Sequence, residues 1–234
     1  MRIGFIILRV IFAFPFYLLK MHRLGVKDPW DREKAYAYVK KIAKLSNKKG
    51  RVTVEAHGVE NIPKEDGFVM FPNHQGMYDV LIFLESCPRP FAFVAKYELK
   101  NVPLLKQTMC ALHSLVINRK DLRQSMKVIQ EMTQRVSQGE NFLIFAEGTR
   151  SRMGNKMNEM KGGSFKSAVK AKAPIVPCAI IDSFIPFDEK SLRKVTVKVF
   201  YLEPMYYEEY KDMSTLDIAT EVKRRIEKTI EENT

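Results

Sequence analysis

From residue 51 onward, short apolar runs rich in β-branched and aromatic residues alternate with longer amphipathic stretches. The short runs predict strands at 51–56, 67–71, 91–95, 114–118, 141–145, 175–181 and 195–201. The amphipathic stretches predict helices at 78–86, 103–111, 122–138, 164–172 and 215–231. This alternation is typical of an α/β domain with a mixed, largely parallel sheet of about seven strands flanked by helices.

The beginning of the chain has a different pattern. Residues 3–19 are strongly apolar, but Arg9 interrupts them, and Pro15 is unfavourable inside a helix. The uninterrupted apolar run, Val10 to Leu19, has 10 residues, which is short for a bilayer span. We favour an interfacial or re-entrant helix here. A transmembrane helix, a buried core segment and a signal peptide remain open, although no small-residue cleavage site follows.

A second N-terminal helix is predicted over 31–47, with Asp31 as its N-cap and Gly50 as its stop. Apolar residues form one of its faces and lysines cover the rest, as in helices that lie in a headgroup layer. The alternative is a surface helix packed on the domain. The predicted organisation is a two-helix membrane-interface motif over 1–50, followed by an α/β domain over 51–234.

The charge distribution supports a membrane partner. The net charge is +12, and residues 1–50 hold 12 Lys and Arg against 3 Asp and Glu. Such an excess attracts either nucleic acid or an anionic membrane. Nucleic acid is excluded as a partner because phosphate contacts need no adjacent oily segment. Three cysteines with no metal-ligand spacing indicate a reducing compartment and no metal site.

His74 is the strongest candidate for chemistry. It follows the apolar run 67–71, at the carboxyl end of a predicted strand, where α/β sheets bind their ligands. Asp79 follows five residues later, and its carboxylate can fix the ring tautomer and leave the other nitrogen basic. The alternatives are a structural histidine and an aspartate that merely caps the next helix.

Two further polar groups follow predicted strands. Glu147, Gly148, Thr149 and Arg150 offer a close backbone approach, a hydroxyl and a planar guanidinium suited to phosphate. The alternative is that residues 147–150 form an ordinary turn without a binding role.

Lys96 and Arg119 end two other predicted strands. If those strands are parallel, both cations meet Arg150 at one sheet edge and require an anion. The alternative is three solvated surface charges.

No Gly-x-Ser-x-Gly elbow, zinc signature, Walker loop or dinucleotide fingerprint occurs. Direct attack by a substrate hydroxyl is therefore favoured over an acyl-serine intermediate, and no cofactor is expected.

Taken together, these motifs resemble the glycerolipid acyltransferase family, in particular the bacterial 1-acyl-sn-glycerol-3-phosphate acyltransferases. The resemblance rests on Asn-His-x4-Asp at 73–79, the spaced Lys96, Leu99 and Arg119, Glu-Gly-Thr-Arg-Ser at 147–151, and the apolar Val-Pro block at 175–180. The chain departs from the family pattern at Gly76, Lys106, Asn118 and Ala146. None of these departures removes a proposed reactive group.

The resemblance implies that His74 is a general base for the hydroxyl of a lysophospholipid and that Asp79 orients it. Lys96, Arg119 and Arg150 would hold the phosphate.

The same resemblance implies that residues 147–149 shape the phosphate pocket and that Pro177 and its apolar neighbours support the acyl chain. The acyl donor would be a coenzyme A thioester or acyl-carrier protein.

The expected function is acyl transfer to the sn-2 hydroxyl of lysophosphatidic acid, giving phosphatidic acid. We expect a peripheral or monotopic protein on the cytoplasmic face of the cell membrane. The alternatives are an acyltransferase that uses glycerol-3-phosphate or another lysophospholipid, and a catalytically silent protein that binds anionic lipid.

Overall fold

A mixed seven-stranded sheet forms the centre of the protein, as the apolar runs predict. The structure is a computed structural model and describes residues 2–234. The strands are β1 (Val52–His57), β2 (Val69–Pro72), β3 (Phe91–Lys96), β4 (Leu115–Ile117), β5 (Asn141–Leu143), β6 (Ile175–Ile181) and β7 (Val195–Tyr201). They lie in the order β1-β7-β6-β2-β5-β3-β4. Only the β6–β7 pair is antiparallel, so β2 to β6 all end at the same edge of the sheet.

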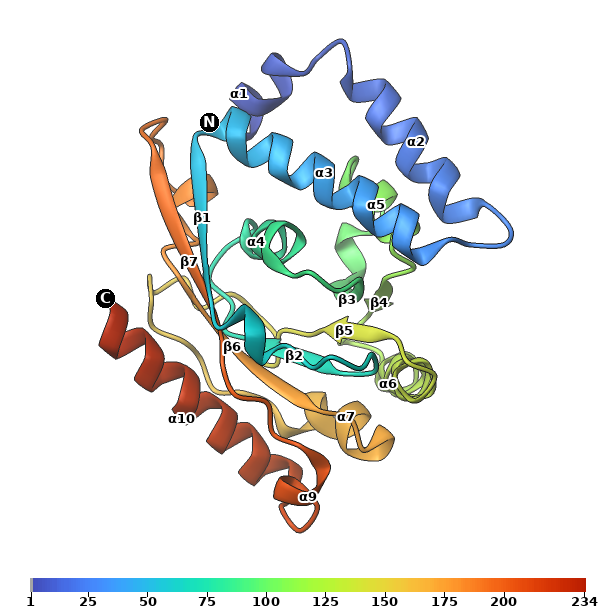
Figure 1. Cartoon of the computed structure of the whole chain (residues 1–234), viewed down its shortest axis with the longest axis vertical. Coiled ribbons are helices and arrows are strands. Elements are labelled where there is room, and N and C mark those ends of the chain that lie inside the picture. Colours follow the sequence, from blue (N-terminus) through green and yellow to red (C-terminus); the bar gives the residue numbers. More distant parts are fainter. Residues whose placement is uncertain (1) are drawn as a thin grey trace.

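Helices cover both faces of this sheet. The α-helices are α1 (Arg2–Arg9), α2 (Phe14–Val26), α3 (Arg32–Gly50), α4 (Asp79–Ser86), α5 (Leu105–Ala111), α6 (Leu122–Ser137), α7 (Lys166–Ala171), α8 (Ile185–Asp188), α9 (Tyr207–Tyr210) and α10 (Thr215–Asn233). Three short 3₁₀ turns are η1 (Val59–Asn61), η2 (Tyr97–Leu99) and η3 (Gly162–Phe165). Figure 1 shows α3, α4 and α5 on one side of the sheet and α6, α7 and α10 on the other.

Each face of the sheet has its own hydrophobic core. Ile82 and Phe83 of α4 pack on one face, together with residues of α3 and α5. Val128 and Met132 of α6 pack on the other face, together with Ile226 of α10. Because β2 and β6 are buried on both faces, their side chains are apolar throughout, as expected for central strands.

Several helix ends follow the predicted capping signals. Asp31 accepts a hydrogen bond from the backbone N–H of Lys34, at 2.9 Å. Asp121 caps α6 in the same way, and Ser214 with Asp217 forms a capping box at α10. These side chains satisfy backbone donors that a helix start otherwise leaves unpaired.

The oily N-terminal segment forms two helices where we expected one. α1 and α2 are separated by residues 10–13, and Pro15 lies in the first turn of α2, where its missing N–H is tolerated. Within residues 2–234, no single helix is both long and apolar enough to cross a bilayer. α1 and α2 pass that test only as a pair, and they are bent by 92°.

The predicted basic helix is α3, and its apolar face is occupied by the domain itself. Ala35, Val39 and Ile42 are buried, and α3 packs against α4 and β1. The expectation that this face lies in a headgroup layer is therefore wrong, and the alternative of a helix packed on the domain is correct. The hydroxyl of Tyr78 also donates to Asn47 Oδ1, at 2.6 Å, so α3 contacts the residue that precedes Asp79.

The start of α1 is held by a buried arginine. The Arg2 guanidinium donates to the carbonyl oxygens of Gly50, Pro186, Ser191 and Arg193, at 2.5–3.0 Å. These carbonyls come from the end of α3 and from the segment around α8. α1 is thereby fixed to the α/β domain, although four of its residues are exposed.

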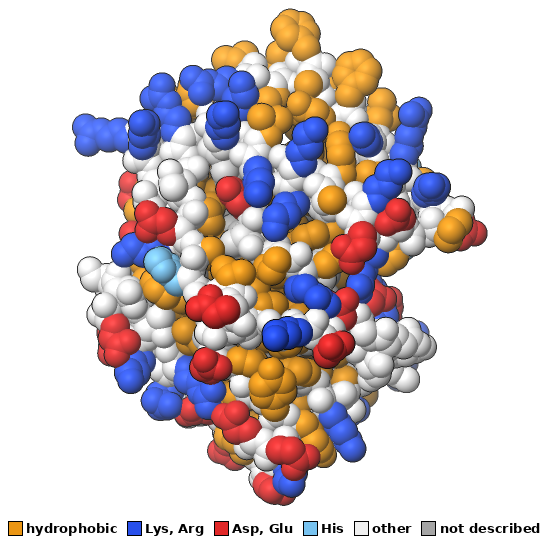
Figure 2. Space-filling view, in the orientation of Figure 1, with side chains coloured by type: hydrophobic (Ala, Val, Ile, Leu, Met, Phe, Trp, Pro, Cys, Tyr) orange, Lys and Arg blue, Asp and Glu red, His pale blue; other side chains and the backbone are white. Residues whose placement is uncertain are grey.

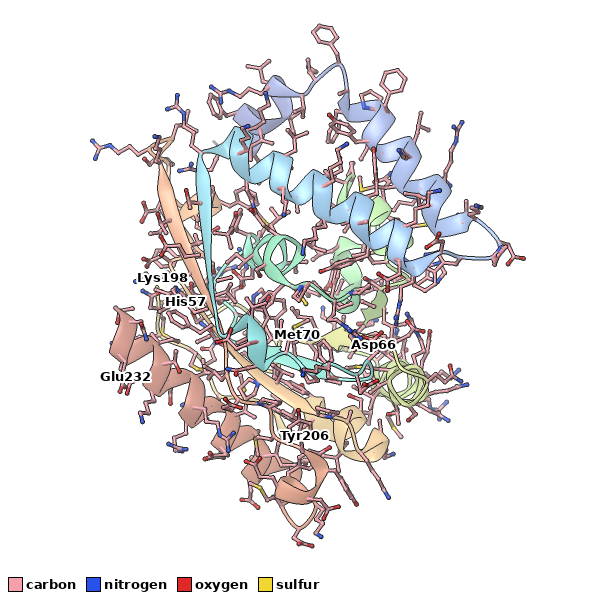
Figure 3. The ribbon with its side chains drawn as sticks, viewed as in Figure 1. His57, Asp66, Met70, Lys198, Tyr206 and Glu232 are labelled. Carbon is pink, nitrogen blue, oxygen red and sulfur yellow. The ribbon has the colours of Figure 1, made fainter. Side chains whose placement is uncertain are left out.

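An aspartate at the amino edge of the sheet, opposite the edge where β2 to β6 end, joins several elements. Figure 3 labels Asp66 beside the beginning of β2. Its carboxylate accepts hydrogen bonds from Arg32 at 2.7 Å, from Arg89 at 2.5 and 2.9 Å, and from Asn141 at 2.8 Å. Burial raises the pKa of Asp66, but these hydrogen bonds outweigh burial and hold the pKa below its ordinary value.

The polar loop at 152–163 is less exposed than its composition suggests. Met157 and Met160 are buried in the core on the α6 side of the sheet. Asn155 accepts a hydrogen bond from the backbone N–H of Asp182, and Asn158 N–H donates to Glu147. Two of the three methionines in this segment turn inward, and only Met153 is exposed, so the segment packs on the domain.

All three cysteines are free thiols. Cys87 and Cys178 are fully buried, and burial raises the pKa of Cys87 to about 11. Cys110 is half-buried on α5, and its Sγ lies 3.7 Å from His22 Nδ1 of α2.

Candidate active site

His74 is placed at the sheet edge by the buried end of β2. Asn73 follows the strand and is fully buried. Its side chain donates to the carbonyl of Ile180 at 3.0 Å and accepts from the N–H of the same residue at 2.7 Å. The end of β2 is thereby fixed to β6, and the next side chain, His74, extends beyond the sheet edge.

His74 and Asp79 form the predicted pair. His74 Nδ1 lies 2.7 Å from Asp79 Oδ2, and the two side chains are 21% and 1% exposed. A carboxylate accepts hydrogen bonds, so Nδ1 carries the proton and Nε2 keeps a free lone pair. Asp79 also accepts from the backbone N–H groups of Gln75 and Gly76 that precede it, and α4 begins without a side-chain cap. The alternative that Asp79 only caps α4 is therefore not what the structure shows.

Two further contacts fix the backbone and ring of His74. The ring stacks on Phe145, with centroids 4.0 Å apart and planes 22° apart. The carbonyl of His74 accepts a hydrogen bond from Ser151 N–H at 2.9 Å. Both partners belong to the segment after β5, so the two sequence motifs meet at one place.

Glu147 joins those motifs more tightly. Its Oε1 accepts from the backbone N–H of His74 at 2.6 Å, and its Oε2 accepts from Asn158 N–H at 2.8 Å. The residue is 2% exposed, and burial raises its pKa, although these two N–H groups act in the opposite direction. Glu147 therefore holds the site together and does not present a free carboxylate.

The turn after Glu147 requires glycine. Gly148 has a φ of +78°, a left-handed conformation that side chains with a Cβ rarely adopt. A Cβ there would lie 3.2 Å from the ammonium of Lys161, so that cation lies directly over the turn. Thr149 is exposed, and Arg150 faces Asp188 at 3.8 Å. Lys161 is a basic group at this turn that the sequence did not single out.

Lys96 ends β3 and Arg119 follows β4, both at the carboxyl edge of the sheet. Their strands are parallel neighbours, and Lys96 pairs in register with Ile117. Lys96 Nζ lies 3.1 Å from Glu98 Oε1. Burial lowers the pKa of Arg119, and nearby Glu98 opposes this shift.

The three predicted cations have different acidic neighbours. Lys96 and Arg119 flank Glu98, while Arg150 faces Asp188. The expectation that the three cations converge on one anion stays a prediction.

Pro177 is not at the sheet edge. It lies in the middle of β6, buried and opposite Phe71 of β2. Its carbonyl accepts from Leu202 N–H at 3.0 Å, and the continuous β6–β7 ladder starts only at the next residue, Cys178. A proline is tolerated where a ladder is interrupted because it has no N–H to donate.

Sequence reasoning missed the polar residues that surround the pair. Ser183 Oγ lies 2.6 Å from Asp79 Oδ1, and Gln75 bonds to Ser183 and Asn155. Ser183 is 104 residues from Asp79 in the chain, and a single serine after a strand carries no motif. No local signal could have found it.

The fold and the site define a class of enzyme. A histidine held by a buried carboxylate at the carboxyl edge of an α/β sheet, with basic residues beside it, is suited to deprotonating a hydroxyl for group transfer. A family model described as Acyltransferase matches residues 53–181. The chain belongs to this acyltransferase family, and the resemblance inferred from the motifs is confirmed.

Individual relatives give the same result. The chain is 30% identical over 184 residues to a probable 1-acyl-sn-glycerol-3-phosphate acyltransferase of Mycoplasma pneumoniae, covering 73% of this chain and 68% of the relative. It is also 30% identical over 126 residues to the 1-acyl-sn-glycerol-3-phosphate acyltransferase of Borreliella burgdorferi, covering 54% and 50%. The chain thus spans two thirds of one relative and half of the other.

A solved structure covers almost the whole chain. The crystal structure of the 1-acyl-sn-glycerophosphate (LPA) acyltransferase from Thermotoga maritima superposes with a TM-score of 0.76 at 26% identity. The match covers 97% of this chain and 91% of that protein.

Proposed function

We propose that this protein transfers a fatty acyl group from a thioester donor to the sn-2 hydroxyl of lysophosphatidic acid, giving phosphatidic acid. The observation that carries the proposal is the 2.7 Å contact between His74 Nδ1 and the buried carboxylate of Asp79 at the open edge of the sheet. Membership of the acyltransferase family supports the reaction type. The names of the relatives support this acceptor.

His74 acts as the general base. Its Nε2 takes the proton of the acceptor hydroxyl while the oxygen attacks the thioester carbonyl. The carbon–sulfur bond then breaks, and the thiolate leaving group takes the proton from the imidazolium. A positioned base contributes about 10²–10⁴-fold to a rate. Asp79 supports both steps because its negative charge stabilises the imidazolium and fixes the ring.

The acceptor phosphate binds at the basic residues of the same edge. Arg150 lies next to the motif that contacts His74, and its 3.8 Å separation from Asp188 is long for an ion pair. A phosphate can therefore replace that partner. Lys96 and Arg119 extend the positive surface along β3 and β4, and Glu147, Gly148 and Thr149 shape the turn that presents Arg150. Pro177 supports the acyl-chain region only from within the sheet, because it is buried in β6.

In this proposal α1 and α2 bind the membrane surface, and the acyl acceptor enters the site from that membrane. Phe12 is 92% exposed and Phe16 is 70% exposed, at and just after the bend between the two helices. Figure 2 shows hydrophobic side chains gathered over this end of the molecule, with Lys and Arg side chains around them. Each basic residue near an anionic membrane contributes about 1 kcal/mol. We place the protein on the cytoplasmic face of the membrane, peripheral or monotopic.

The decisive experiment is an acyl-transfer assay with the purified protein in mixed vesicles. Lysophosphatidic acid is offered with acyl-coenzyme A and with acyl-carrier protein in turn. Glycerol-3-phosphate and a lysophospholipid with a larger headgroup serve as competing acceptors. Formation of phosphatidic acid at the highest kcat/KM supports the proposal. A higher kcat/KM with another acceptor would show that this other acceptor, and not lysophosphatidic acid, is the substrate. Vesicle binding without any acyl transfer would indicate a silent lipid-binding protein.

A further inference from the structure

Ser183 lies directly beside the carboxylate that holds His74. It follows β6, in the turn before α8, and it is fully buried. Its Oγ lies 2.6 Å from Asp79 Oδ1. We propose that Ser183 is a positioning residue that holds Asp79 in the rotamer that presents Oδ2 to His74. This inference rests on the proposed role of His74 as the base.

Four donors saturate the Asp79 carboxylate. Oδ1 accepts from Gly76 N–H at 3.0 Å and from Ser183 Oγ at 2.6 Å. Oδ2 accepts from Gln75 N–H at 2.8 Å and from His74 Nδ1 at 2.7 Å. Three of the donors belong to the turn just before Asp79. Among the residues that the structure describes, Ser183 is therefore the one donor that fixes the carboxylate to another part of the fold.

That single attachment has a mechanical consequence. The terminal torsion of an aspartate is soft and has no sharply staggered minimum. Without Ser183, Oδ1 keeps only the longer bond to Gly76 N–H, at 3.0 Å, so the carboxylate plane is held less firmly. Asp79 and the His74 ring then lose their fixed orientation together, and a misplaced base lowers the rate of proton transfer.

The direction of the Ser183 hydroxyl is set by its neighbours. The Oγ is 3.0 Å from Gln75 Oε1, which also accepts from the backbone N–H of Ser183 at 2.9 Å. A hydroxyl has one proton, and the shorter contact is to the charged acceptor, Asp79. Gln75 is itself held, because its Nε2 donates to Asn155 Oδ1 at 2.9 Å and to the carbonyl of Ile180 at 3.0 Å.

The backbone around Ser183 packs tightly on the histidine motif. A Cβ at Gly76 would lie 3.2 Å from the carbonyl oxygen of Ser183 and 3.1 Å from the Cα of Phe184. Gly76 therefore allows the turn after β6 to approach closely enough for Ser183 to reach Asp79. This close approach gives a physical reason for glycine at that position.

The test compares Ser183→Ala with a matched control, Ser167→Ala. Ser167 is also fully buried, but its hydroxyl has no hydrogen-bond partner. We expect Ser183→Ala to lower kcat by about 10- to 100-fold, with the acceptor KM within about twofold of the wild type. Ser183→Cys keeps a side chain of similar size with a weak S–H donor, so its kcat should lie between those of the wild type and Ser183→Ala. Ser167→Ala should leave both constants unchanged.

A spectroscopic measurement separates positioning from a general loss of structure. The proton on His74 Nδ1 gives a downfield NMR resonance as long as Asp79 accepts its hydrogen bond. We expect Ser183→Ala to shift or broaden this resonance and Ser167→Ala to leave it in place. A wild-type kcat, or an unchanged resonance in Ser183→Ala, overturns the proposal.

The same measurement distinguishes this proposal from the function on which it rests. If the wild type transfers no acyl group to any acceptor, the proposed function fails. The His74 resonance of Ser183→Ala still decides whether Ser183 positions the pair.

Discussion

Two carboxylates at opposite edges of the sheet are held by similar numbers of hydrogen bonds but have different partners. Asp79, at the carboxyl edge, is 1% exposed and bonds to a histidine, a serine and two backbone N–H groups. Asp66, at the opposite edge, is 22% exposed and bonds to Arg32, Arg89 and Asn141.

The difference lies in whether the partner can give up its proton. An arginine stays charged at all accessible pH values, so Asp66 is part of a fixed ion pair that joins α3, β5 and the segment before β3. A histidine exchanges its proton near neutral pH, so Asp79 can support a base. The same acceptor chemistry therefore serves stability at one edge and proton transfer at the other.

Removing the base tests the carboxyl edge most severely. His74→Ala should abolish acyl transfer because it removes the imidazole that takes the proton of the acceptor hydroxyl. The protein should remain folded, since His74 contributes only a stacked ring and one side-chain hydrogen bond. Steady-state turnover and circular dichroism check both expectations. Turnover near the wild-type level would refute the mechanism.

Replacing each carboxylate by its amide tests the comparison directly. Asp79→Asn should lower kcat by about 10²–10⁴-fold, because the amide neither stabilises the imidazolium nor fixes the tautomer. Asp66→Asn should leave kcat unchanged and lower the free energy of unfolding by about 1–3 kcal/mol, because two guanidinium groups lose a charged acceptor. Kinetics and urea unfolding of both variants are needed. If both variants lose activity equally, the assignment of proton transfer to Asp79 and of stability to Asp66 is wrong.

Arg150→Ala is expected to have a smaller effect. It should raise the KM for lysophosphatidic acid by about 10- to 100-fold, as for loss of a hydrogen bond to a charged group, with a lesser change in kcat. Arg224→Ala, on the exposed surface of α10, is the control and should behave like the wild type. An unchanged acceptor KM in Arg150→Ala would show that the phosphate binds elsewhere.

The smallest expected effect is a difference in acid sensitivity. The pKa of folded Asp66 lies below its ordinary value, so its stabilising contribution is complete above about pH 4 and is lost as the pH falls through the folded pKa. Urea midpoints of the wild type should therefore fall with acid more steeply than those of Asp66→Asn. If the urea midpoints of the two proteins fall in parallel below pH 4, protonation of Asp66 is not linked to stability.

Much of the fold could be predicted because burial leaves a clear local pattern. The strands at 175–181 and 195–201 were predicted with the same bounds that the structure shows. The 92° bend between α1 and α2 was missed because both helices are apolar across the break. The packing of α3 was also misjudged, since an apolar face has the same sequence whether a lipid or a protein covers it.

The candidate site was predictable only where its residues are neighbours in the chain. The His74–Asp79 pair spans five residues, and one turn brings its members together. Ser183 reaches Asp79 through the pairing of β6 with β2, which no local pattern records. The acidic residues beside the predicted cations, Glu98 next to Lys96 and Asp188 next to Arg150, carried no motif and were not predicted.

The three cysteines described above differ in a way that makes the protein convenient to label. Cys87 and Cys178 are inaccessible and remain protonated thiols, because burial raises the pKa of each. Cys110 is the only cysteine with solvent access, and it lies where α5 meets α2. A maleimide fluorophore therefore attaches at one native position next to the oily helices, without removal of any other cysteine.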